Sequence, residues 1–313
     1  MIKAEFYSPK LIDVWNDFIG NAVNGHFMFN RNFMDYHSDR FKDASVLLFE
    51  ESGVLQGIFP ANKSERTIFS HQGLTFGGMV YSKKLNTRGV IEAFDCLIDF
   101  FRLHGYEKII YKKIPDFYAT TLAQDDLYAL FKVGAKLYRR DISSTIDLST
   151  KYSYTKGRKW SVNKGRKNGI SIDEDGCWSE FWEILNGVLI ERHGVKAVHS
   201  ITEIMGLKRS FPENIKLFTA SKDNEVLAGS LLFIDKNVVH TQYLANSSLG
   251  RNLGALDYLI DFLLNKYSTD KWYFDFGIST EQEGRLINEG LLAQKEGFGA
   301  RCTVHDFYEI ELK

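Results

Sequence analysis

One nine-residue pattern occurs twice in this chain. Ala93–Phe101 and Ala255–Leu263 are identical at six of nine positions and lie 162 residues apart. A histidine precedes each copy at a corresponding place, His71 in the first and His240 in the second. Solenoid repeats have periods of ~20–50 residues, so this longer period indicates a duplicated domain. Where the two copies differ, we expect to find the residues that carry function.

The length of 313 residues also fits two domains of ordinary size. We predict a first domain over residues 1–149 and a second over 150–313. The charges nearly cancel, with 39 basic and 40 acidic residues, so nothing drives the whole chain towards DNA or an anionic surface. The three cysteines have no metal-binding spacing, and no apolar run reaches the ~20 residues of a membrane helix. We expect a cytoplasmic protein without a metal or an integral membrane segment.

Each half reads in the same order: strand, two helices, antiparallel meander, helix, strand, helix, strand. A right-handed crossover through one helix can set the flanking strands parallel. The sequence therefore predicts an α/β fold with mixed sheets and helices on both faces. In the second half we expect, after the meander, a loop at Ala245–Gly254, helices at Ala255–Tyr267 and Glu281–Glu289, and strands at Trp272–Phe276 and Gly299–Leu312.

The segment before the second repeated helix is suited to an anion. Its two glycines permit close approach of the backbone to a ligand, and a helix N-terminus offers unpaired N–H groups and partial positive charge. Arg251 can add a bidentate contact to a phosphate. The alternative is a plain capped loop. The candidate cofactor-binding residues are Leu249, Gly250, Arg251, Asn252, Leu253, Gly254 and Ala255.

A meander, an Arg-x-x-Gly segment, a helix and a parallel strand resemble the GCN5-related N-acetyltransferase (GNAT) fold. Two such domains in tandem resemble the FemABX peptidoglycan-bridge transferases and the BioF2-like acetyltransferases. Tyr273–Thr280, followed by Lys295–Gly299, is similar to the closing signature of that family. Leu256 departs from the pattern, because the family usually has glycine or alanine there. The resemblance implies transfer of an acyl group to an amine from coenzyme A or an aminoacyl-tRNA, with backbone N–H groups near Gln242–Ala245 polarising the donor carbonyl.

An amine must lose a proton to attack, so a nearby proton acceptor is expected. His240, Tyr243, Asp275 and Glu281 are candidates because they stand at strand ends near the crossover. A carboxylate inside the aromatic run of Asp275 is costly unless it is paired or used, whereas Lys112 occupies the matching place in the first copy. Lys295 is a candidate to neutralise charge on the donor. A structural role remains the alternative for each of these residues.

Two further segments are candidates for substrate binding. The stretch from Lys151 to Ile170 has seven basic residues and no acidic one, and Lys164 and Arg166 in it can contact phosphates; a solvated interdomain helix is the alternative. The glycine-rich segment Gly73–Gly78 has no counterpart in the second copy. It can bind a sugar or phosphate, or it can be a tightly packed turn. Its candidate residues are His71, Thr75, Phe76 and Gly77.

These features lead to one preferred function and two alternatives. The first is an N-acyltransferase that moves an acyl group, in the simplest case acetyl, from acyl-coenzyme A to an amino sugar or another cell-envelope or polysaccharide precursor. That acceptor is expected in a groove between the domains, with the second domain holding the donor and the first the acceptor. The second is a FemX-like ligase that uses aminoacyl-tRNA. The third is a catalytically silent module that binds a sugar or nucleotide.

Overall fold

The computed structural model describes residues 2–312 and divides into two compact units. The first consists of Met1–Asp141, Gln282–Gly284 and Val304–Lys313, and the second of Ile142–Glu281 and Arg285–Thr303. The continuous part of the first unit thus ends at Asp141, before the predicted domain boundary after residue 149. The C-terminal residues, which we predicted in the second domain, belong to the first unit. Two long strands, β9 (Lys136–Asp147) and β17 (Arg301–Glu311), pass from one unit into the other.

The first unit has two sheets. One has the order β1-β3-β4-β7, and the other contains β17-β8-β6-β5-β2, in which β6 and β8 are parallel. Helix α3, the first copy of the repeat, packs against α4 and β1, and its buried face includes Phe94, Leu97 and Phe101. The strands are β1 (Ile2–Phe6), β2 (Lys42–Asp43), β3 (Val46–Glu50), β4 (Leu55–Phe59), β5 (Asn62–Ser64), β6 (Thr67–Phe69), β7 (Val80–Tyr81) and β8 (Lys108–Lys112), and the helices are α1 (Ile12–Asn21), α2 (Arg31–Met34), α3 (Thr87–Leu103) and α4 (Asp125–Lys132).

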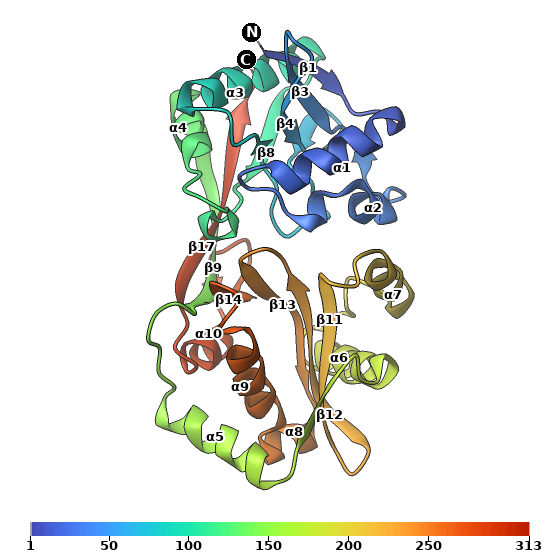
Figure 1. The fold of residues 1–313 in the computed structure, drawn as a ribbon, viewed down its shortest axis with the longest axis vertical. Helices are drawn as coiled ribbons and strands as arrows, with labels where there is room; N and C mark the ends of the chain where they lie inside the picture. Colours follow the sequence, from blue (N-terminus) through green and yellow to red (C-terminus); the bar gives the residue numbers. More distant parts are fainter. Residues whose placement is uncertain (1, 313) are drawn as a thin grey trace. The chain divides into compact units, whose positions relative to one another are not determined.

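The second unit is built on a mixed sheet with the order β10-β11-β12-β13-β14-β9. Helices α5 and α9 lie side by side (Figure 1), while α6 packs against β12 and β13. The elements are α5 (Lys156–Lys167), β10 (Ser171–Glu174), α6 (Trp178–His193), α7 (Ile201–Ser210), β11 (Ile215–Lys222), β12 (Glu225–Ile234), β13 (Val238–Asn246), α8 (Ser248–Leu253), α9 (Ala255–Tyr267), β14 (Tyr273–Ile278), β15 (Thr280–Glu281), β16 (Leu286–Ile287) and α10 (Glu289–Glu296).

The repeated helix has the same role in both units. Val90, Ala93 and Leu97 of α3 are buried in the first core, and Ala255, Leu259 and Leu263 of α9 are buried in the second. These positions have the 3–4-residue spacing of one helical face. Ala93 and Leu97 are identical to their counterparts Ala255 and Leu259, so these shared residues of the repeat belong to the two cores.

Two local expectations for the second half are wrong. The predicted loop Ala245–Gly254 is strand as far as Asn246 and then the short helix α8. The predicted helix Glu281–Glu289 is a hairpin of β15 and β16, and the helix begins only at Glu289. Left-handed backbone at Gln282, Glu283 and Gly284 forces the turn, and the Asn288 side chain then caps α10 by accepting from the Leu291 N–H.

Across residues 2–312, no helix combines the length and the apolar character that a transmembrane span requires.

Candidate active site

The centre of the second unit is the parallel pair of strands β13 and β14. Their register runs from Val238–Tyr273 to His240–Asp275 and ends there, although both strands continue. The chain passes between them through α8 and α9, the crossover that the sequence predicts. His240 and Asp275 thus face each other at the last paired position. Just beyond them the backbone of β13 leaves β14.

Asp275 is fully buried and its carboxylate has four hydrogen-bond donors around it. Oδ1 accepts from Ser143 Oγ at 2.8 Å, Thr145 Oγ1 at 3.1 Å and the Gly277 N–H at 3.1 Å. Oδ2 lies 2.8 Å from His240 Nδ1. A buried carboxylate is tolerated when its lone pairs are satisfied in this way, and the four donors fix its orientation.

The carboxylate also fixes the state of the imidazole. Because Asp275 Oδ2 accepts a hydrogen bond, we assign the proton to His240 Nδ1, which leaves Nε2 as the basic nitrogen of the neutral ring. The side chain of His240 is 10% exposed. Gly277 has a φ of +75°, and a Cβ at this position would lie 3.2 Å from His240 Cε1. An imidazole nitrogen oriented in this way by a buried carboxylate can accept a proton from a neighbouring group.

Lys295 joins this cluster from α10. Its ammonium donates to the Gly277 carbonyl at 2.8 Å, the Ile278 carbonyl at 2.7 Å and Ser279 Oγ at 2.9 Å. Burial lowers the pKa of Lys295 to about 8, and the nearby Asp275 charge opposes that shift. All three N–H bonds are used within the protein. Lys295 therefore holds the segment after Asp275, and we describe it as a positioning residue.

Tyr243 lies on the same face of β13 as His240, because a bulge at Gln242 restores the alternation. His240 pairs with Phe233 and Tyr243 with Leu231, which are two residues apart on β12. Tyr243 Oη is 2.8 Å from Nδ1 of the buried His199, and its ring packs edge-on against Trp182. Burial raises the pKa of Tyr243. Glu281, by contrast, is exposed and accepts from Asn288 Nδ2.

The predicted cofactor residues do not form a loop. Leu249–Leu253 lie in α8, and Gly254, with a φ of +78°, separates it from α9, which begins at Ala255. The Arg251 guanidinium bonds the Asn246 carbonyl at 2.9 Å and Ser248 Oγ at 2.8 Å. A Cβ on Gly254 would come within 2.4 Å of the Ser161 carbonyl on α5. Leu256, the departure from the family pattern, is buried in the core.

The basic helix is confirmed as α5. Arg166 pairs with Asp261 of α9, and its guanidinium lies 5.9 Å from the Tyr258 ring centroid. Lys164 Nζ lies 4.8 Å from the ring centroid of Trp160. Neither residue contacts the His240–Asp275 pair. Their role in substrate binding stays a prediction.

The first unit has a corresponding pair of parallel strands, but no carboxylate faces the histidine there. The parallel register of β6 and β8 ends at Phe69–Ile110, and two residues further along each chain stand His71 and Lys112. Lys112 donates to the carbonyls of His71 at 3.0 Å, Gln72 at 3.4 Å and Leu74 at 2.7 Å. A lysine therefore replaces the carboxylate. The buried His71 ring stacks on His37 instead, with 5.0 Å between centroids.

The glycine-rich segment after His71 is closely packed. A Cβ on Gly77 would lie 1.9 Å from the Ser70 carbonyl, and one on Gly78, at a φ of +90°, would lie 2.8 Å from Tyr111 Oη. Phe76 is buried against His26 and Tyr118, whereas Thr75 is partly buried. Tight packing accounts for the glycines here, and ligand binding by this segment stays a prediction.

Lys112 gives a prediction for stability against pH. Burial, with a smaller effect of Arg139, lowers the pKa of Lys112 from 10.5 to about 7. Above pH 7 the folded protein releases a proton that the unfolded chain still holds, so this group makes folding more favourable as the pH rises. We expect the free energy of unfolding of the wild type, minus that of Lys112→Met, to rise by about 1.4 kcal/mol per unit between pH 7 and 9. Denaturant titrations at each pH measure it, and a flat difference would contradict it.

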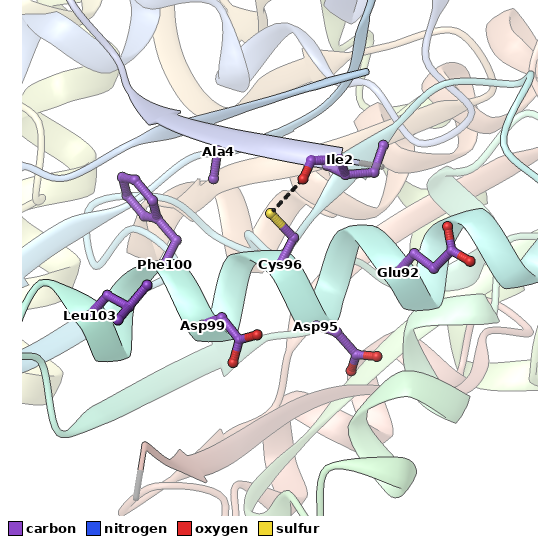
Figure 2. A pocket seen from close by; sticks show the side chains of 8 residues that line it. All are labelled: Ile2, Ala4, Glu92, Asp95, Cys96, Asp99, Phe100 and Leu103. Carbon is purple, nitrogen blue, oxygen red and sulfur yellow. Dashed lines mark hydrogen bonds between the residues drawn. The ribbon is translucent and has the colours of Figure 1, made fainter. Parts of the chain in front are cut away.

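A cavity of about 450 Å³ lies between β1 and α3 in the first unit (Figure 2). Its apolar wall includes Ile2, Ala4 and Phe100, and the Cys96 thiol donates to the Ile2 carbonyl. The three acids on its rim are paired, Glu92 with Arg88, Asp95 with Lys132 and Asp99 with Arg102. Burial raises the pKa of Cys96, which disfavours the reactive thiolate. This cavity has no group suited to the predicted chemistry.

Sequence reasoning missed several residues of the site. Ser143 and Thr145 come from β9, and Thr145 Oγ1 lies 2.8 Å from Thr303 Oγ1. The sequence feature that could have indicated them is the run of small hydroxyl residues inside a strand, since hydroxyl groups can donate hydrogen bonds to a buried carboxylate. His199 was missed because its partner Tyr243 is 44 residues away. Ser279 belongs to the family signature, but nothing indicated that Lys295 would bind it.

Comparisons with known proteins find the fold but no sequence relative. No family model matches the chain, and neither does any curated protein. Among solved structures, FemX is similar, with a TM-score of 0.69 and 12% identity over 99% of this chain and 97% of that one. The chain has the FemX fold.

Two further solved structures also have a fold similar to that of this chain. The L-PGS of Bacillus licheniformis has a TM-score of 0.62 at 10% identity, over 99% of this chain and 93% of that one. The C-terminal domain of a putative lysylphosphatidylglycerol synthetase from Agrobacterium fabrum has a TM-score of 0.61 at 13% identity, over 97% and 92%. The FemX-like fold that the sequence resemblance predicts is confirmed.

Proposed function

We propose that this protein is an acyltransferase that joins an activated acyl group to an amine. The observation that carries the proposal is the buried His240–Asp275 pair, at the point where the register of β13 and β14 ends. A neutral imidazole held by a carboxylate is suited to accept a proton from an attacking amine. In this proposal His240 is the catalytic base, and Asp275 is the residue that positions it.

The reaction then proceeds as a direct transfer. The amine nitrogen attacks the donor carbonyl carbon and gives its proton to His240 Nε2. Backbone N–H groups of β13 near Gln242–Ala245 stabilise the oxyanion, which is a large contribution in acyl transfer generally. The C–N bond forms, the bond to the leaving thiol or hydroxyl breaks, and the leaving group takes up a proton. Tyr243, on the same face as His240, is placed to hold a substrate at this end of the strand.

For the donor, acyl-coenzyme A, with acetyl as the simplest acyl group, is our first candidate. The near-equal numbers of 39 basic and 40 acidic residues give no general attraction for tRNA. An aminoacyl-tRNA ester is the second candidate. The internal contacts of Arg251 and Gly254 favour this donor, because they leave fewer groups of this segment available to bind the pyrophosphate of coenzyme A. FemX and the lysylphosphatidylglycerol synthetase domain share the fold and direct attention to cell-envelope acceptors.

For the acceptor we propose an amine on a sugar or another envelope or polysaccharide precursor. We assign it to the first unit, because Lys112 replaces the carboxylate there, and we assign the donor to the second, which has the His240–Asp275 pair. His71, Thr75, Phe76 and Gly77 are the proposed acceptor residues. A silent sugar- or nucleotide-binding module is the alternative from another class, and retention of binding without turnover would favour it.

The test is a transfer assay with two donors. Purified protein is incubated with radiolabelled acetyl-coenzyme A or aminoacyl-tRNA and a panel of amino sugars, nucleotide-linked amino sugars and peptidoglycan precursors. We expect transfer from one donor class only, and its loss in His240→Gln. If neither donor gives transfer while ligand binding persists, the acyltransferase proposal fails and the binding module is supported.

A further inference from the structure

The outer face of α5 is a compact cationic surface, which we call the α5 lysine face. It consists of Lys156, Lys159, Trp160, Asn163, Lys164 and Lys167. At 100° per residue these positions lie within an arc of about 140°. No acidic residue occurs in the helix. Trp160 is 63% exposed at the middle of this face.

The opposite side of α5 is fixed to the second unit. Val162 and Gly165 are buried, and a Cβ on Gly165 would lie 2.6 Å from Tyr258 Cβ. The two arginines have carboxylate partners on α9: the partly buried Arg158 pairs with Asp257, and the more exposed Arg166 pairs with Asp261 at 3.5 Å. The arginines therefore attach the helix, while no ion pair is found for the four lysines among the described residues. Helix packing holds their charges outwards.

The composition of this face indicates which class of partner would bind there. Lysine stems that carry ammonium groups, around an exposed tryptophan, match an interface where anionic head groups lie above apolar chains. Tryptophan is enriched at such interfaces, since its ring is apolar and its N–H is polar. Recognition of a nucleic acid backbone more often uses arginine forks and several stacking aromatics. Here both arginines pair with carboxylates of α9, and the α5 lysine face has one aromatic residue.

We propose that the α5 lysine face docks the protein on an anionic lipid membrane. The lysines bind lipid phosphates electrostatically, and Trp160 enters the head-group region. The contact is peripheral and reversible, because the apolar side of α5 is packed against α9 and cannot insert. A protein docked in this way meets lipid-linked substrates at the membrane surface. The proposal does not depend on the proposed acyl transfer.

The test is sedimentation of the full-length protein with phosphatidylcholine vesicles that contain or lack 30% phosphatidylglycerol. Each lysine near an anionic surface changes partition by about fivefold. Replacement of Lys156, Lys159, Lys164 and Lys167 by glutamine should therefore lower binding several-hundredfold. The matched control replaces the exposed Lys10, Lys83, Lys84 and Lys196, which removes the same net charge elsewhere. Far-ultraviolet circular dichroism and unfolding curves check that both variants fold.

Three results support the proposal together. Wild type and control bind only anionic vesicles, the α5 variant does not, and binding weakens as salt rises. Quenching by lipids brominated in the acyl chain should decrease in Trp160→Phe, because the other four tryptophans lie elsewhere. Equal binding by both quadruple variants would overturn the proposal. So would binding of an RNA oligomer that the α5 variant loses, in the absence of any binding to anionic vesicles.

Discussion

His240→Gln is expected to lower kcat/KM for acyl transfer by about 10²–10⁴-fold, the usual contribution of a general base. The glutamine side chain can keep a hydrogen bond to Asp275 but has no basic nitrogen. Asp275→Asn is expected to have an effect in the same range, because the amide oxygen can take the place of Oδ1, whereas the NH2 group in the place of Oδ2 cannot accept a hydrogen bond from His240 Nδ1. The ring of His240 then loses its fixed orientation.

Initial rates with the productive donor, measured across pH, test this prediction. The double variant should be little worse than either single variant, because the two residues act as one unit. Ser230→Ala is the control, since Ser230 is a buried hydroxyl on the neighbouring strand β12 with no hydrogen-bond partner among the described residues. It should leave both rate and fold unchanged. Retention of more than about one tenth of the wild-type rate in His240→Gln would exclude it as the base.

The two units differ in the residue that made Asp275 the preferred candidate in the sequence. Both units place a histidine near the end of a parallel strand pair, so the histidine alone carried no information. The facing residue differs, Asp275 in one unit and Lys112 in the other, and that contrast was readable from the aligned repeats. An aromatic strand that contains a carboxylate is unusual enough to indicate a paired charge.

Other parts of the site depend on contacts that no local pattern encodes. Ser143 and Asp275 are 132 residues apart, and only the register of β9 with β14 brings them together. The break at Gly254 is set by α5, whose backbone leaves no room for a Cβ. Gly254 is a predicted ligand-binding residue, and the structure gives it a packing role against α5 that its sequence neighbours did not indicate.

The division of the chain into units was also only partly predictable. The strands β9 and β17 were expected, but not their passage from one unit into the other. Their lengths of 12 and 11 residues were the available signal, since strands of ~5–6 residues are typical. A strand twice that length has enough backbone to contribute residues to two units.

Lys295→Met is expected to lower the free energy of unfolding by about 3 kcal/mol or more. The methionine fills a similar volume, but the Gly277 and Ile278 carbonyls and Ser279 Oγ lose their donor, and an unsatisfied buried polar group costs about 1–3 kcal/mol. Ser279→Ala should cost about 1 kcal/mol, because one of the three bonds is lost. Denaturant unfolding gives both values. Lys271→Met is the matched control, since that lysine bonds two carbonyls in a more exposed loop and should cost less than about 1 kcal/mol.

The same variants distinguish a positioning lysine from a catalytic one. If Lys295 only holds Gly277–Ser279, its loss shifts the segment that orients Asp275 and His240. Activity should then fall in both Lys295→Met and Ser279→Ala, and it should fall less in the second, because only one of the three bonds is lost there. If Lys295 instead neutralises charge on the donor, Ser279→Ala keeps full activity and Lys295→Met raises KM for the donor alone. Because all three of its N–H bonds are used internally, we expect the first pattern.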